Sequence, residues 1–261
     1  MKIPLLETLG ICEDRMNLLL LLYNGPMKKR KILESLEISS QALVPTIRTF
    51  EHNNIVVNHD GTYELTSIGK LIVDEIIPFL ETLEFLESNF DYLAEHKLDF
   101  IPFYLLKRLR ELYPYTILRP TFSETLEFNK QLEETTDASK TFYIVTSLLL
   151  PSFPAFFSKW ISEGVEISMI VSEELFEKIQ SNNLLFFNEL LAKEQMDFLV
   201  YPGNMGFQNF ILNDYCFSWH LLSKTGNVSG EQLISCNQNA LEWGKELFEY
   251  YKQCSNPVTS I

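Results

Sequence analysis

Basic side chains gather in one short stretch of this 261-residue sequence. Residues 28–48, which include the run Lys28-Lys29-Arg30-Lys31, carry five Lys/Arg against two Glu, a net charge of +3, whereas the whole chain carries −14. Cations near the start of a helix oppose its dipole, so contact with an external phosphate explains them better than helix stability does. A solvated surface run is the alternative interpretation.

The elements that would position these cations are two helices joined by a turn. In residues 39–53, Leu43, Ile47 and Phe50 recur at helical spacing and define one inward face. Ser39 is a good N-cap, because its hydroxyl accepts a hydrogen bond from a free backbone N–H of the first turn. Pro45 breaks the local rules, and we expect the helix to bend there; the alternative is a helix that begins at Val44 or Pro45.

A hairpin is expected directly after these helices. Residues 55–57 and 63–65 are strand-like and flank Asp60-Gly61, a pair that tolerates positive φ. Such an arrangement is typical of a winged helix-turn-helix, whose second helix enters the DNA major groove, although an ordinary piece of α+β core is the alternative. We expect DNA contacts from Lys28, Lys29, Arg30, Ser39, Ser40, Gln41, Val44, Pro45, Arg48, Thr49, Asn58 and His59.

Composition bounds the class of protein. A hydrophobic content of 46% supports a folded core. The longest apolar run, Leu18–Tyr23, is too short to span a membrane and lies behind acidic residues that do not fit a signal peptide, so we expect a cytoplasmic protein. Because the four cysteines are scattered without a C-x-x-C pair, we expect small apolar residues, with neither a zinc ribbon nor a disulfide framework. They are Cys12, Cys216, Cys236 and Cys254.

We expect a long helix over residues 67–95, with a kink or break at Pro78. A second helix is expected to start at Pro102 and to extend to Leu112. Apolar residues in the first helix are spaced alternately four and three apart, as in the seam between two packed helices. Since two-fold symmetric operators need dimers, we favour a homodimer contact over packing within one domain. The seam residues are Ile72, Ile76, Phe79, Leu83, Leu86 and Phe90.

From Tyr115 onward, strand-like runs alternate with helical stretches, which predicts βαβ units. The expected strands lie at 116–120, 141–147, 165–172 and 196–202, and an antiparallel pair covers 207–224. The expected helices lie at 124–136, 152–163, 173–194 and 238–252. The fold class is therefore α+β: a winged helix-turn-helix at 1–70, a helical linker and dimerisation segment at 71–114, and an α/β regulatory domain with a mainly parallel sheet at 115–261.

Enzymatic chemistry finds little support in the second half. The chain has no G-x-G-x-x-G, P-loop, G-x-S-x-G or H-E-x-x-H motif, and we expect no enzyme, cofactor or metal. A ligand pocket is more plausible, because ligands of open α/β sheets lie beyond the carboxyl ends of the strands. Hydroxyls there are also ordinary helix caps, and aromatic residues can simply fill a core. The candidate ligand-binding residues are Thr146, Ser147, Ser172, Glu173, Trp219 and His220.

Five stretches together resemble one known family. They are NLLLLLYNGP (17–26), SSQALVPTI (39–47), TYELTSIGKLIVDEIIPFLETLE (62–84), GVEISMIVSEELFEKI (164–179) and ALEWGKELFEYY (240–251). They resemble ArsR-like winged-helix transcriptional regulators of methanogenic archaea with a C-terminal methanogenesis-regulator domain. Pro45 belongs to that family's recognition-helix pattern.

The resemblance implies sequence-specific transcription control by a dimer, with double-stranded DNA as partner. It also implies a C-terminal domain distantly similar to phospholipase D. The chain lacks the H-x-K-x-x-x-x-D motif, which suggests sensing without catalysis. Our leading hypothesis is a homodimeric DNA-binding regulator that responds to a small-molecule effector. The alternatives are a small-molecule enzyme with a winged-helix docking module, which would depend on His220, and a protein-binding adaptor, which would never engage DNA.

Overall fold

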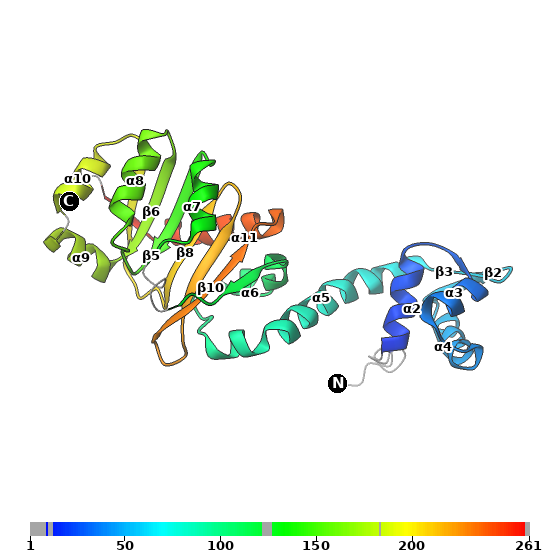
Figure 1. Cartoon of the computed structure of the whole chain (residues 1–261). Coiled ribbons are helices and arrows are strands. Elements are labelled where there is room, and N and C mark those ends of the chain that lie inside the picture. The colour runs from blue at the N-terminus through cyan, green and yellow to red at the C-terminus, as the bar shows by residue number, and fades with distance from the viewer. Residues whose placement is uncertain (1–8, 10–12, 122–126, 183, 259–261) are drawn as a thin grey trace. The chain divides into compact units, whose positions relative to one another are not determined.

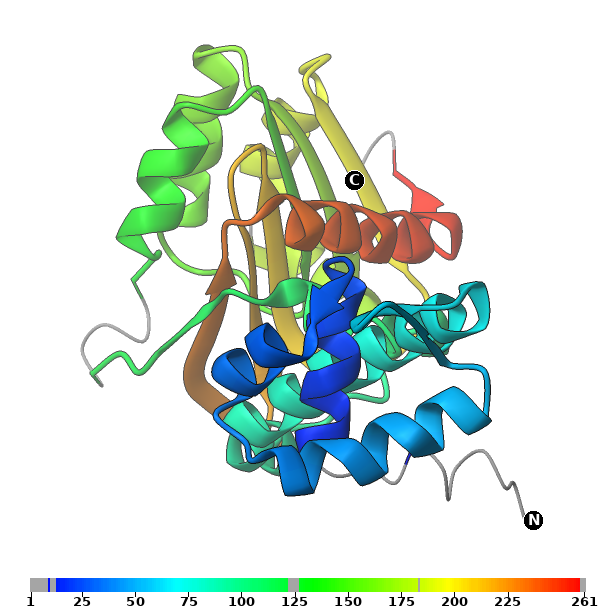
Figure 2. The same ribbon diagram turned by 90° about the vertical axis from the view of Figure 1, so that its right-hand side faces the viewer.

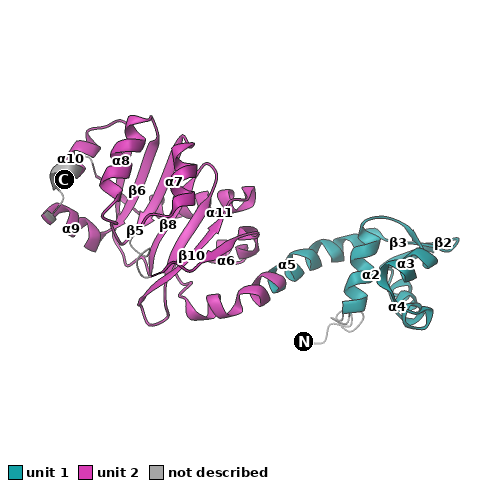
Figure 3. Ribbon diagram, in the orientation of Figure 1, with its two compact units in different colours: residues 1–83 teal, residues 84–261 magenta. Residues whose placement is uncertain are grey.

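A computed structural model describes residues 9, 13–121, 127–182 and 184–258 of the chain (Figure 1). The chain divides into two compact units, Met1–Leu83 and Glu84–Ile261 (Figure 3). Each unit has buried hydrophobic residues of its own, so each is described by itself.

The first unit has the helix-turn-helix and hairpin that the sequence predicts. Its elements are α2 (Glu13–Tyr23), β1 (Met27–Lys28), α3 (Lys29–Leu36), α4 (Ser40–His52), β2 (Val56–His59) and β3 (Thr62–Leu65). Strand β3 pairs antiparallel with both β2 and β1, and the pairing of β1 was not predicted. The spacing of Met16, Leu19, Leu20 and Tyr23 predicts a first helix over 5–24, and residues 5–8 and 10–12 of that range lie outside the described residues.

Helix α4 starts where its cap residue predicts. The Ser39 hydroxyl accepts a hydrogen bond from the Ala42 backbone N–H over 3.3 Å. The helix continues through Pro45, so the alternative that it begins at Val44 or Pro45 is wrong. Because Pro45 offers no N–H, one intrahelical hydrogen bond is missing there. Its carbonyl still accepts a hydrogen bond from the Thr49 hydroxyl over 2.9 Å.

The hairpin turn has the geometry that its two central residues favour. Asp60 and Gly61 have φ angles of 50° and 81°, and two successive positive values are the signature of a type I′ turn. The Asn58 side-chain oxygen accepts a hydrogen bond from the Gly61 N–H over 2.9 Å, which closes the turn. The turn prediction is confirmed.

Helix α5 (Ser67–Glu95) is continuous through Pro78, so the predicted break at that residue is wrong. Its backbone instead leaves helical geometry at Asn89, where φ is −134° and ψ is 15°. The Asn89 side chain donates a hydrogen bond to the Phe85 carbonyl over 2.7 Å and so satisfies a backbone acceptor at the kink. The Thr82 hydroxyl donates a hydrogen bond to the Pro78 carbonyl over 2.7 Å.

Residues 102–112 do not form the single helix predicted for them. The structure has a short α6 (Phe103–Leu106) with Pro102 at its N-cap, followed by the 3-10 helix η1 (Leu109–Leu112). Leu105, Leu109 and Leu112 are nonetheless buried, as the periodicity indicated.

The second unit is built on one large mixed sheet. Its order is β11-β7-β6-β5-β8-β9-β10-β4. The strands are β4 (Thr116–Leu118), β5 (Thr141–Thr146), β6 (Glu166–Ser172), β7 (Met196–Tyr201), β8 (Phe207–Asn213), β9 (Phe217–Leu222), β10 (Val228–Ser235) and β11 (Asn256–Pro257). Strands β10 and β11 were not predicted.

The expected mainly parallel sheet is wrong. Among the strands that the structure describes, only β5 with β6 and β6 with β7 pair in parallel, because helices connect those strands. Strand β8 returns antiparallel beside β5, and the following strands continue as antiparallel neighbours. The predicted antiparallel pair over 207–224 is confirmed as β8 and β9.

Helices cover both faces of this sheet (Figures 1 and 2). Four helices pack against one face: α7 (Lys130–Asp137), α8 (Phe153–Ser162), α9 (Glu173–Asn182) and α10 (Leu184–Leu191). Helix α11 (Gln238–Gln253) crosses the other face, where its buried side chains join those of α6 and η1. The Trp243 indole N–H donates to the Leu105 carbonyl over 3.0 Å and ties α11 to α6.

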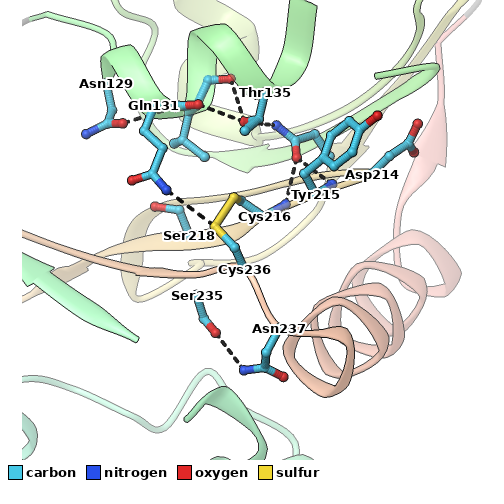
Figure 4. The surroundings of a disulfide bond; sticks show 12 residues. Asn129, Gln131, Thr135, Asp214, Tyr215, Cys216, Ser218, Ser235, Cys236 and Asn237 are labelled. Carbon is cyan, nitrogen blue, oxygen red and sulfur yellow. Dashed lines mark hydrogen bonds between the residues drawn. A yellow bond between two sulfur atoms is a disulfide. The ribbon is translucent and has the colours of Figure 1, made fainter. Parts of the chain in front are cut away.

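A disulfide joins Cys216 to Cys236, which contradicts the expected absence of disulfides (Figure 4). Cys216 directly precedes β9 and Cys236 directly follows β10. Because Phe217 and Ser235 are register partners, the two cysteines are the next opposed pair, with Cα atoms 4.1 Å apart. Cys254 is a free, exposed thiol. The disulfide was not predicted because the sequence of β10 lacks the pattern of a strand.

Candidate nucleic-acid interface and ligand cavity

The outward surface of α4 presents polar side chains and a cation. Gln41, Pro45 and Arg48 are exposed, while Val44 and Thr49 are half-buried. The opposite side of the helix anchors it, since its three inward residues are no more than 3% exposed. An exposed amide and guanidinium on a firmly packed helix are groups that bind base edges or phosphates.

The start of α4 offers further donors. Ser39 and Ser40 are exposed, and the Ser39 hydroxyl caps the helix. A helix N-terminus has free backbone N–H groups and a partial positive charge, which favours a nearby anion. A phosphate approaching this end of α4 would meet both serine side chains.

The basic run lies at the junction of β1 and α3. Lys28, Arg30 and Lys31 are exposed and Lys29 is half-buried. Arg30 Nε lies 2.8 Å from a Glu34 carboxylate oxygen, but the two side chains are 92% and 62% exposed. An ion pair this exposed contributes little, so Arg30 can exchange the carboxylate for a phosphate at small cost.

The hairpin contributes Asn58 and His59 from β2, both of them exposed. The Asn58 oxygen is occupied by the turn, which leaves its amide N–H groups to donate outward. His59 Nε2 lies 3.5 Å from a Glu64 carboxylate oxygen, a contact that is an ion pair only when the imidazole is protonated.

The structure brings the predicted DNA-contacting residues together in one unit. They lie on β1, α3, α4 and β2, with Ser39 just ahead of α4. None of the twelve is fully buried. Their contact with DNA remains a prediction.

The predicted dimer seam divides into two parts. Ile72 and Ile76 are partly buried and pack against the core of the first unit. The remaining four residues are exposed along α5, at 49%, 43%, 38% and 68%; they are Phe79, Leu83, Leu86 and Phe90. We call these four residues the α5 stripe.

Three of the predicted ligand-binding residues form hydrogen bonds with nearby backbone groups. The Thr146 hydroxyl donates to the Leu148 carbonyl over 2.5 Å, and the Ser147 hydroxyl donates to the Phe207 carbonyl over 2.9 Å. The Ser172 hydroxyl accepts from the Leu175 N–H over 3.2 Å at the start of α9, and Glu173 is exposed. These hydroxyls therefore act as the turn and cap groups that were the alternative interpretation.

Trp219 and His220 do not line one cavity, because consecutive strand residues point to opposite faces. Trp219 is buried among the residues that face α11, where its indole N–H donates to the Tyr92 hydroxyl over 3.1 Å. His220 lines a cavity of about 360 Å³. Its polar wall includes Gln208 of β8 and Gln232 of β10, side chains not predicted to bind ligand. The consecutive polar residues Gln208 and Asn209, at the start of a strand with a strongly apolar middle, were the sequence signal for this site.

The imidazole of His220 is neutral near neutral pH, because burial lowers its pKa to about 4. Its Nδ1 lies 3.1 Å from the Asn209 side-chain oxygen. Since that oxygen only accepts, Nδ1 carries the proton and Nε2 is an acceptor. In hydrolase triads a carboxylate occupies the position that Asn209 has here, so His220 lacks the partner that stabilises an imidazolium.

Among the described residues, no group of three or more His, Cys, Asp or Glu side chains is arranged to hold a metal ion. In the same part of the chain, no helix is long and apolar enough to cross a membrane. The fold thus defines a protein with an N-terminal winged helix-turn-helix unit and a C-terminal mixed-sheet α/β unit.

Two family models match these units. Residues 6–87 match the HVO_A0261 N-terminal domain, and residues 125–253 match the middle domain of the methanogenesis regulatory protein FilR1. The chain is also similar to the methanogenesis regulatory protein FilR1 of Methanothrix harundinacea (strain 6Ac), with 22% identity over 250 residues. That similarity covers 94% of this chain but 56% of the relative, so the chain spans little more than half of the relative's length.

Two solved structures show weaker likeness. TrmBL2, an archaeal chromatin protein, has a TM-score of 0.44 and 12% identity, with 98% of each chain covered. Nuc of Salmonella typhimurium, a phospholipase D family member, has a TM-score of 0.41 and 10% identity, covering 56% of this chain and 99% of its own.

Proposed function

We propose that the chain is a sequence-specific DNA-binding transcription regulator of an archaeal, ArsR-like type. The similarity to a methanogenesis regulatory protein over 94% of the chain supports regulation. The observation that carries DNA binding is the exposed surface of α4, which belongs to the same unit as the basic run and is anchored by a buried inward face. The helix would read bases in the major groove, and the hairpin would contact the neighbouring backbone.

Charge distribution supports this assignment. Residues 28–48 carry a net +3, whereas residues 79–261 carry thirteen Lys/Arg against twenty-five Asp/Glu, a net of −12. The acidic part is repelled by phosphates, which weakens non-specific binding and favours contact through the first unit. Cytoplasmic location, with double-stranded DNA as the partner, is part of the proposal.

We further propose that the regulator is a homodimer held in part by the α5 stripe. A single winged-helix unit makes few base contacts, and two copies would supply a second half-site. Three of these exposed apolar side chains, Phe79, Leu83 and Leu86, recur at i, i+4 and i+7 before the kink at Asn89, a spacing that suits packing of one α5 against another. Phe90 directly follows the kink. Residues 71–114 would then connect DNA-binding and effector-binding parts, and an effector would shift the dimer between two geometries.

The experiment that tests phosphate contact is a salt series of mobility shifts with the double variant Lys29→Ala/Arg30→Ala. Each phosphate contact adds about 0.9 to the slope of log affinity against log salt concentration. We expect the variant to lower that slope by about 1–2 for each bound protomer. Lys193→Ala/Lys245→Ala removes the same charge from exposed positions in the second unit and is the matched control. Equal slopes for wild type and the first variant would contradict the assignment.

A further inference from the structure

The cavity at His220 contains a buried acceptor that has no partner within the described chain. The Gln208 side chain is 6% exposed, and its Oε1 has no hydrogen-bond donor. A buried polar atom left unpaired lowers the stability of the fold. Proteins rarely retain such an atom without a use, and the residue that carries it, Gln208, lines a cavity of about 360 Å³. It therefore marks a position for a donor supplied by a ligand.

A second acceptor lies in the same cavity wall. With Nδ1 directed at Asn209, the free ring nitrogen of His220 is Nε2, which accepts hydrogen bonds. Gln232, the register partner of His220, donates its own amide to the Ser218 hydroxyl over 2.7 Å. Gln232 therefore does not occupy His220 Nε2. Two acceptors, Gln208 Oε1 and His220 Nε2, are left for an incoming molecule.

Charges around the cavity come in both signs. Arg119 is paired with Glu231 over 2.6 Å, and Lys130 lies 3.7 Å from Glu134. Glu127 adds a carboxylate to the lining. An anionic ligand would face that carboxylate together with the two acceptors, while a cationic ligand would face Arg119 and Lys130. Neither sign of ligand charge is favoured, so a neutral molecule suits the lining best.

An apolar wall completes the cavity. Leu118, Pro120 and Phe128 line it, and the Phe128 ring is fixed by contacts with Phe156 at 5.2 Å and Trp160 at 5.6 Å between ring centroids. A rigid aromatic wall opposite a few convergent polar groups is the usual composition of a small-molecule site. A ligand with one flat apolar side would pack against it.

We propose that this cavity binds a neutral small molecule that donates N–H or O–H hydrogen bonds to Gln208 and His220 and packs an apolar part against Phe128. The inference rests on the effector role in the proposed function and gives that effector a chemical class. It also moves the site from the carboxyl ends of β5 and β6 to the surface formed by β8, β9 and β10.

Three probe molecules that share one shape but differ in charge test the proposed chemical class of the ligand. Benzamide is a neutral donor, benzoate an anion and benzamidine a cation, and each has the same flat ring. Millimolar concentrations of each are added to the full-length protein without DNA, while the unfolding temperature and the ¹⁵N resonances of the His220 ring are recorded. We expect benzamide alone to raise the unfolding temperature and to shift the His220 Nε2 resonance. Because DNA is absent, failure here is separable from failure of DNA binding.

The variant Gln208→Met distinguishes a ligand role from a structural one. It replaces the unpaired acceptor with an apolar side chain of similar length, so the ligand-free protein should unfold at a higher temperature than wild type. The same variant should lose the response to benzamide. Gln180→Met, at an exposed position in α9, is the control and should change neither. No response to any probe, a preference for benzoate or benzamidine, or an undiminished benzamide response in Gln208→Met would each overturn the proposal.

Discussion

The indole nitrogen of Trp219 donates a hydrogen bond to the phenolic oxygen of Tyr92 over 3.1 Å. Tyr92 is near the end of α5 and Trp219 is in β9, and they are 5% and 0% exposed. The bond therefore joins the last turns of α5 to the large sheet inside the second unit. Burial raises the pKa of Tyr92 far above its ordinary value, so the phenol stays neutral and keeps accepting this bond at physiological pH.

Replacing Tyr92 with phenylalanine should destabilise the second unit. The substitution leaves the buried Trp219 N–H without an acceptor, which costs about 1–3 kcal/mol. Urea unfolding followed by tryptophan fluorescence measures the loss. Tyr104→Phe, at a residue that is 49% exposed, is the matched control and should change stability little. Equal stability of the two variants would show that the bond contributes nothing.

Removing the disulfide should lower the free energy of unfolding of the second unit. Cys216 and Cys236 are 20 residues apart, and a cross-link closing a loop of that size contributes about 3 kcal/mol. The double variant Cys216→Ser/Cys236→Ser should therefore unfold at a lower urea concentration than the wild type.

Sensitivity to reductant provides the control for that experiment. Dithiothreitol should destabilise wild type and Cys254→Ser alike, because Cys254 is already a free thiol. It should leave the double variant unchanged. A wild type that does not respond to full reduction would mean that the disulfide does not stabilise the fold.

Stability should fall on acidification as His220 is forced to protonate. Burial lowers its pKa to about 4 from an ordinary 6.5, so the unfolded chain binds the proton first. This effect is absent above pH 6.5, and stability is lost progressively as pH falls toward 4. The total loss is about 3 kcal/mol, since one pKa unit corresponds to about 1.4 kcal/mol.

The comparison that isolates His220 is unfolding between pH 7 and 4 in wild type and in His220→Gln. Other titrating groups act equally in both proteins, so the difference between the two curves reports His220 alone. We expect the variant to lose less stability than wild type over this interval. Parallel curves would mean that the imidazole titrates at its ordinary pKa.

The α5 stripe should control association. Leu83→Glu/Phe90→Glu places two charges in the apolar contact that we propose between protomers, and each would be buried without a partner. Sedimentation velocity should show the wild type as a dimer and the variant as a monomer at the same concentration. Phe103→Glu, at a residue 69% exposed in α6, should remain dimeric. A monomeric wild-type protein would contradict the proposal that the α5 stripe holds a homodimer.

Local sequence signals determined much of the first unit. Ser39, the Asp60-Gly61 pair and the helical spacing of Leu43, Ile47 and Phe50 act over a few residues, and each appears in the structure as expected. The kink in α5 has a local cause other than the proline that suggested it. Proline at 78 suggested a break, but the helix leaves regular geometry at Asn89, whose side chain bonds to the carbonyl of Phe85.

The second unit was harder to predict because its features depend on strand order. Strand β10 contains Gly230 and polar residues and has an irregular register, so its sequence lacks a strand pattern. Without β10, neither the disulfide nor the wall formed by Gln232 could be anticipated. The site at the ends of β5 and β6 was inferred from a parallel sheet, and the antiparallel return of β8 beside β5 made that inference invalid.

The most direct test of the account is a mobility shift of the wild-type protein on genomic DNA fragments, including its own promoter. The assay is carried out across a salt series with excess non-specific competitor. We predict discrete complexes on a few fragments that persist with competitor and that weaken when Gln41 or Arg48 is replaced by alanine. Uniform weak binding to every fragment, lost at modest salt and unaffected by either substitution, would contradict the proposal that α4 reads DNA sequence.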